Sequence, residues 1–91
     1  MKAWQYIQKG WCQGSVARTK TGKACSIHSR NATAWCLLGA VCKSYSGYER
    51  WVIEERVYEL IIDVSISDWN DYPKRTKAEV IAVLKKAEGK P

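Results

Sequence analysis

Apolar residues recur at helical spacing in one central stretch of the chain, residues 31 to 45, with the sequence NATAWCLLGAVCKSY. The apolar positions that share one helical face include Trp35, Leu38, Cys42 and Tyr45. Gly39 would let a second backbone approach closely. A helix this apolar needs partners on several sides, so we expect it to form the buried centre of the fold, with Ser29 or Asn31 as its N-cap.

Residues 2 to 9 and 48 to 63 also have helical periodicity. In the first, Trp4 and Ile7 are expected to face inward. Gly10 is expected to end this helix in the left-handed conformation, so that Trp11 folds back onto Tyr6. In the second, the predicted buried face consists of Ile53, Val57, Leu60, Ile61 and Val64. A second apolar edge of that helix contains Trp51, Tyr58 and Ile62.

A capping box predicts the start of the last helix, because Thr76 and Glu79 can accept hydrogen bonds from each other's backbone N–H groups. Its expected inward positions are Val80, Ile81, Leu84 and Ala87, and Gly89 and Pro91 are expected to end it. Residues 13 to 27 lack the helical period and predict a loose β-hairpin with its turn at residues 20 to 23. Residues 65 to 75 predict a loop, because Ser, Asp, Asn and Pro surround a single Trp.

These elements predict a mostly α fold. We expect one small domain, residues 1–91, with about four helices around a central buried helix and a short β-hairpin between the first two. The chain of 91 residues has a formal charge of +6, which favours anionic partners. No stretch of about 18 apolar residues and no signal peptide is recognisable. We therefore expect a cytoplasmic protein that does not bind membranes.

Four motifs occur in an order that is similar to a known family. They are GWCQG at residues 10–14, AWCLLGA at 34–40, Ile66 with Trp69-Asn70-Asp71 and Pro73, and Arg75-Thr76 with Glu79-Val80. In these motifs the chain resembles, over nearly its whole length, a family of small proteins of unknown function found in bacteria and their phages. The resemblance implies a mostly helical fold and a phage or prophage setting. It implies no catalytic residue.

The candidates for chemistry are few. His28 is the only histidine, and it could form a catalytic pair with Cys12, Cys25 or Cys36. The same four residues could form a zinc site, although only Cys25 and His28 have knuckle-like spacing. Single cysteines and one histidine also occur together by chance. We therefore expect no enzyme activity, no cofactor, no metal and no disulfide that folding requires.

What remains is a set of residue types suited to binding, namely Trp11, Gln13, Arg18, Trp69, Asn70, Asp71 and Arg75. Indole rings stack on bases, and an arginine fork binds phosphate. Each residue also has a structural interpretation. Asn70 and Asp71 could only shape a turn, Trp69 could only fill the core, and Arg75 could be buried and tied to Asp71.

The leading functional hypothesis is a phage-encoded, non-enzymatic protein that captures a phosphate-bearing nucleotide, such as an immune signal, in the host cytosol. Because so short a chain encloses little by itself, we expect a homo-oligomer. The alternative is an inhibitor that docks on a host defence protein, as anti-CRISPR proteins do, or on its nucleic acid. Nucleic acid is thus a further candidate partner.

Overall fold

The computed structural model describes residues 1–62 and 64–89. Along the chain the elements are α1 (Ala3–Lys9), β1 (Ala17–Thr19), β2 (Ala32–Trp35), α2 (Leu37–Ser44), α3 (Gly47–Ile61), α4 (Ile66–Asp71) and α5 (Lys77–Glu88). The predicted mostly helical fold, with a two-stranded antiparallel sheet between the first two helices, is confirmed. No helix within the described ranges has the length and the apolar run that crossing a bilayer requires.

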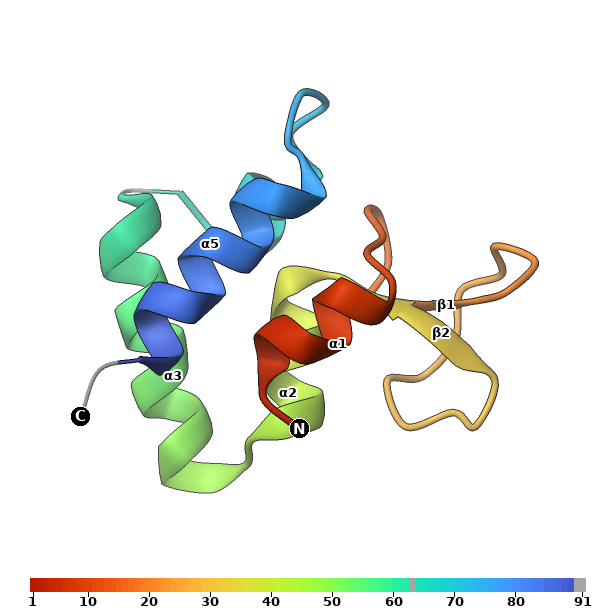
Figure 1. Cartoon of the computed structure of the whole chain (residues 1–91), viewed down its shortest axis with the longest axis horizontal. Coiled ribbons are helices and arrows are strands. Elements are labelled where there is room, and N and C mark those ends of the chain that lie inside the picture. The colour runs from red at the N-terminus through yellow and green to blue at the C-terminus, as the bar shows by residue number, and fades with distance from the viewer. Residues whose placement is uncertain (63, 90–91) are drawn as a thin grey trace.

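Helix α2 lies at the centre of the fold, as predicted, and it contacts α1, α3, α4 and β2. Helix α5 packs across α1 and α3, and the hairpin and α3 lie at opposite ends of the molecule (Figure 1). The largest fully buried apolar side chains come from four helices and are Ile7, Leu37, Val41, Val57, Val80 and Leu84. One core therefore joins both ends of the chain.

The central helix is shorter than predicted, because residues 32–35 form strand β2. Neither Ser29 nor Asn31 caps α2. The N-cap is Cys36, whose Sγ accepts a hydrogen bond from the backbone N–H of Gly39. Trp35 is buried, and its ring packs edge-on against Tyr6 at 5.0 Å between ring centroids. Residues 32–35 form a strand because they pair with β1, which is distant in the sequence. Hydrophobic periodicity carries no information about such pairing.

Two glycines allow backbones to meet. A Cβ on Gly39 would lie 2.1 Å from the carbonyl oxygen of Val16, so the predicted close approach at position 39 is confirmed. Gly10 serves a similar purpose, since a Cβ there would lie 2.1 Å from the carbonyl oxygen of Thr33. The predicted left-handed conformation of Gly10 is wrong, because its φ of −174° is extended. The extended backbone carries Trp11 into a bridge with Trp35 instead of back onto Tyr6.

The hairpin turn lies where the sequence predicts it. Thr19 donates a backbone hydrogen bond to the carbonyl of Lys23, and Gly22 occupies the turn at a φ of +90°. The main partner of β1 is β2, which lies ten or more residues further along the chain. The register places Ala17 opposite Trp35, Arg18 opposite Ala34 and Thr19 opposite Ala32.

Helix α3 buries Ile53, Val57 and Ile61 as predicted, and Leu60 is half-buried. Its predicted last residue, Asp63, lies outside the described residues. The prediction that Val64 belongs to the buried face is wrong, since 41% of that residue is exposed. Ile62 has a φ of +49°, and this turn of the backbone ends the helical period before Val64 is reached.

The predicted capping box at the start of α5 is confirmed. Thr76 donates its backbone N–H to Glu79, and Glu79 donates its backbone N–H to the Thr76 hydroxyl. Ile81 is half-buried. The helix ends at Glu88, with Gly89 as its C-cap, and Pro91 lies outside the described residues. The fully buried positions are Val80, Leu84 and Ala87.

The predicted loop at residues 65–75 contains a short helix, α4, so that prediction is wrong for Ile66–Asp71. Ser65 caps α4, because its hydroxyl accepts the backbone N–H of Asp68. Ser and Asp favour both turns and helix starts, and the sequence alone does not separate the two. Packing against α2 and α3 stabilises the helical form.

The two ends of the chain are joined by a buried carboxylate. Glu88, at the end of α5, accepts the backbone N–H groups of Ala3 at 2.8 Å and Trp4 at 2.9 Å. The hydroxyl of Tyr45 donates to the same carboxylate. Glu88 thereby satisfies free donors at the start of α1, where a negative charge is favoured.

We expect Glu88→Ala to lower the free energy of unfolding by about 2–4 kcal/mol, because buried donors lose a charged acceptor. Chemical denaturation measures this change. Glu88→Gln, which retains an acceptor, should lose less, and the exposed Glu59→Ala is the control. Equal effects of Glu88→Ala and Glu59→Ala would show that the carboxylate contributes little.

Candidate functional site

The fully buried side chain of Asn70 is the centre of a polar network between α4, α2 and the segment that follows α1. Its Oδ1 accepts the indole N–H of Trp11 at 2.8 Å and the backbone N–H of Leu37 at 3.0 Å. Its Nδ2 donates to the carbonyl of Cys12 at 3.1 Å and to Asp71 Oδ1 at 2.9 Å. Each side-chain polar atom of Asn70 is therefore bonded inside the protein.

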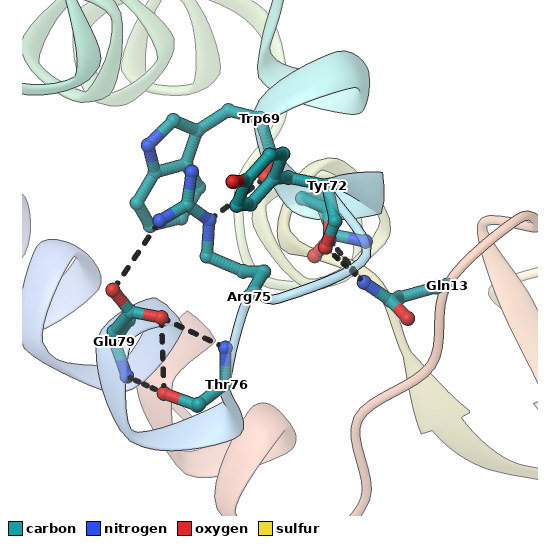
Figure 2. A network of polar contacts seen from close by, with 7 residues as sticks. Gln13, Trp69, Tyr72, Arg75, Thr76 and Glu79 are labelled. Atoms are coloured by element: carbon teal, nitrogen blue, oxygen red, sulfur yellow. Dashed lines mark hydrogen bonds and ion pairs between the residues drawn. The ribbon is translucent and has the colours of Figure 1, made fainter.

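Gln13 and Asp71 extend this network on both sides of Asn70. Gln13 Nε2 donates to the carbonyls of Asn70 at 2.9 Å and Tyr72 at 3.0 Å (Figure 2). Asp71 Oδ1 also accepts the backbone N–H of Gly14 at 3.0 Å. These bonds fasten residues 11–14 to the C-terminal end of α4.

Arg75 lies flat on the indole ring of Trp69, with its guanidinium carbon 3.7 Å from the ring centroid (Figure 2). Its Nε donates to the carbonyl of Trp69 at 2.9 Å, and its Nη1 lies 3.3 Å from Glu79 Oε2. Only 16% of the Arg75 side chain is exposed. The interpretation that ties Arg75 to Asp71 is wrong, because its ionic partner is Glu79, one turn into α5.

Arg18 joins the same region from β1. Its Nε and Nη2 donate to the carbonyl of Gln13 at 3.2 and 3.0 Å, and its Nη1 donates to the carbonyl of Gly22 at 3.0 Å. The fork of Arg18 therefore holds the hairpin turn against the segment that carries Gln13.

The structure thus brings all seven predicted binding residues into one region. It also gives the polar side chains among them internal partners, which is the arrangement of a structural joint. A role in ligand binding for these residues stays a prediction. The open space beside them is a hollow of about 270 Å³, lined by Gly14, Ser15, Val16, Cys36, Ser67 and Asp71.

The four cysteines are all free thiols, and two of them border this region. Burial raises the pKa of Cys12 to about 11, with the nearby Cys36 as a smaller cause. Burial also raises the pKa of Cys36, against the lowering effect of backbone N–H groups from Gly39 and Leu38. Because the thiolate is the nucleophile, both residues are poorly prepared for covalent catalysis at neutral pH. Across residues 1–62 and 64–89, no three His, Cys, Asp or Glu side chains gather as metal ligands would.

A second candidate site lies on the hairpin, where an open hollow of about 470 Å³ is lined by Thr19, Lys20, Thr21, Lys23, Arg30, Asn31 and Thr33. Lys20, Lys23 and Arg30 are exposed. In the part of the chain that the structure describes, none of these three cations has an ion-pair partner. We refer to this surface as the hairpin hollow.

Charge is unevenly distributed along the chain. Residues 1–48 contain no Asp or Glu, and all nine acidic residues follow position 48. The first 48 residues carry seven cations, which are Lys2, Lys9, Arg18, Lys20, Lys23, Arg30 and Lys43. This unevenness is the sequence signal that could have located the hairpin hollow. The sequence placed Lys20 and Lys23 at the turn, but only strand pairing brings Arg30 and Asn31 beside them.

The fold is that of a small helical protein built on one central helix, with a polar joint at one side and a basic hairpin beyond it. The chain belongs to a family of unknown function, DUF6197, which matches residues 2–90. No curated protein matches the chain, and no solved structure matches it. The family of the chain is therefore known, but it assigns no activity to the chain.

We expect Asn70→Ala to lower the free energy of unfolding by about 3–5 kcal/mol, because it strands the buried donors of Leu37 and Trp11. Urea denaturation followed by tryptophan fluorescence measures the change. The exposed Asn31→Ala is the matched control and should remain within about 0.5 kcal/mol of the parent protein. A similarly small effect of Asn70→Ala would contradict the role assigned to this network.

Arg75→Ala should lower the free energy of unfolding by about 1–2 kcal/mol, because it removes a hydrogen bond and the stack on Trp69. Denaturation and ligand titration on the same variant separate structure from binding, with Lys74→Ala as the control for charge. If Arg75→Ala lost ligand binding but kept the free energy of unfolding of the parent protein, Arg75 would be a ligand contact.

Proposed function

We propose that this protein is a non-enzymatic binding protein that captures a phosphate-bearing ligand of nucleotide size in the hairpin hollow. The observation that carries this proposal is the gathering of three cations around one hollow, in the half of the chain that has no acidic residue. None of the three has an ion-pair partner in the part of the chain that the structure describes. Among the described residues, the two ion pairs lie elsewhere, between Arg50 and Glu54 and between Arg75 and Glu79.

The groups around the hairpin hollow suit phosphate. Lysine ammonium groups bind phosphate as point charges, and an arginine fork binds two of its oxygens at once. Hydroxyl and amide donors complete such a site, and they are supplied by Thr19, Thr21, Asn31 and Thr33. Because none of the described residues that line the hairpin hollow is acidic, the lining itself does not offset the positive potential there.

The volume of about 470 Å³ lies in the range of small-molecule sites, roughly 300–1,000 Å³. Such sites usually enclose most of their ligand, whereas the hairpin hollow is open. A second copy that covers the hairpin would close it, and this favours the predicted homo-oligomer. Native mass spectrometry reads subunit number and retained ligand together.

Binding without catalysis is supported by the raised pKa values of Cys12 and Cys36, and no acidic group lines the hairpin hollow within residues 1–62 and 64–89. The finer proposal is sequestration of a nucleotide immune signal by a phage-encoded protein in the host cytosol. That setting depends on the resemblance of the motifs to bacterial and phage proteins. The alternative is docking on a host defence protein or its nucleic acid.

The test is isothermal titration with mono-, di- and cyclic dinucleotides on the parent protein and two triple variants. Lys20→Ala/Lys23→Ala/Arg30→Ala removes the cations of the hairpin hollow, and Lys74→Ala/Lys77→Ala/Lys86→Ala removes equal charge from exposed positions elsewhere. We expect the first variant to lose at least tenfold in affinity and the second to lose little. A bound ligand at about 100 times its Kd should also stabilise the parent by about 2.7 kcal/mol.

Three outcomes would contradict the proposal. Equal losses in both triple variants would indicate only a general charge effect. No response to any nucleotide would favour docking on a protein. Binding of DNA or RNA that weakens steeply with salt, with no response to nucleotides, would favour nucleic acid as the ligand.

A further inference from the structure

Helix α3 presents a row of large apolar side chains to solvent. The exposed fractions are 76% for Tyr48, 55% for Trp51, 48% for Tyr58 and 69% for Ile62, the residue that caps the helix. The spacing of three and seven residues places Tyr48, Trp51 and Tyr58 along one side of the helix, and Ile62 follows at its C-terminal end. The rings of Tyr48 and Trp51 also contact each other, at 5.8 Å between centroids. We call these four residues the outer face of α3.

The outer face of α3 is not a by-product of core packing. The core side of the same helix is fully supplied by other residues, Ile53, Val57 and Ile61. The exposed rings present apolar surface on the order of 300–450 Å². An exposed apolar area of this size on one side of a small protein commonly marks an interaction site.

Acidic residues border the outer face of α3. Glu55 lies within the row, between Trp51 and Tyr58, and the same helix carries Glu49, Glu54 and Glu59. Arg50 is paired with Glu54 at 3.7 Å, and Arg56 donates to the carbonyl of Ala87 on α5. A protein of net charge +6 thus carries an acidic apolar face, at the end of the molecule opposite the hairpin (Figure 1).

We propose that the outer face of α3 docks against a basic amphipathic helix of a partner protein, one whose apolar stripe is bordered by Lys and Arg. Two packed helices contact each other through anchors at this spacing, and the bordering charges select the partner. A second copy is a poor occupant, because pairing of two α3 helices would bring their glutamates together around Glu55. Nucleic acid and anionic membranes are repelled by the same glutamates. This inference is independent of the hairpin hollow and stands without it.

Trp51 is the central anchor, because it lies between Tyr48 and Tyr58 and has the largest ring. Aromatic side chains at the centre of an interface usually carry most of the binding energy. All three rings are exposed, so their truncation should leave the fold intact.

Two synthetic helical peptides test the proposal. Both carry leucine at heptad spacing, and they differ only in the bordering residues, which are lysine in one and glutamate in the other. Binding is followed by two-dimensional NMR of the isotope-labelled full chain. The net charge of +6 works against the lysine peptide everywhere except at an acidic face.

We expect the lysine peptide to shift the amide signals of residues 48–62, and the glutamate peptide to leave them unchanged. Trp51→Ala/Tyr58→Ala should weaken binding at least tenfold, whereas Tyr72→Ala, a truncation of an equally exposed ring, should not. Glu54→Lys/Glu55→Lys/Glu59→Lys should reverse the preference between the peptides.

Equal binding of both peptides, or no shift on α3, would overturn the proposal. So would a dimer of the parent protein that becomes a monomer with Trp51→Ala/Tyr58→Ala, because a second copy would then cover this face. Sedimentation velocity distinguishes that outcome.

Discussion

The buried amide of Asn70 is the constraint on which the rest of the structure depends. An amide can satisfy both donors and acceptors, and Asn70 bonds the indole of Trp11, the first backbone N–H of α2 and the carbonyl of Cys12. No apolar side chain could replace it without leaving those groups unpaired. The amide therefore fixes α4 against the segment that follows α1, and the hairpin is in turn held to that segment through Arg18.

The sequence was most informative where structure is local. Helical spacing alone predicts the buried side of α3. The capping box of α5 follows from Thr76 and Glu79, which lie three residues apart. Prediction from the sequence failed where contacts with distant segments determine the local structure. Residues 32–35 were predicted as helix, yet their backbone pairs with β1, and burial of Trp35 suits either conformation. Helix α4 was missed because Ser65 and Asp68 have the composition of a turn.

The predicted binding residues illustrate the difference between finding a region and finding its role. Trp11, Gln13, Asn70 and Asp71 do converge, but their polar atoms bond one another. The hairpin hollow needed the structure, since strand pairing brings Arg30 beside Lys20. The molecule that results has a basic hairpin at one end and an acidic, aromatic helix at the other. One chain could thus bind an anionic ligand and a basic protein at separate surfaces.

We infer that the Asn70 network is a structural joint, and we propose that anions bind the hairpin instead. Two-dimensional NMR of the full chain during titration with a dinucleotide tests both parts together, because indole N–H signals are resolved from backbone amides. We expect shifts in residues 19–33, with the Trp11 indole signal unchanged and protected from exchange. Shifts at the Trp11 indole and Asn70 with an unchanged hairpin would contradict this expectation.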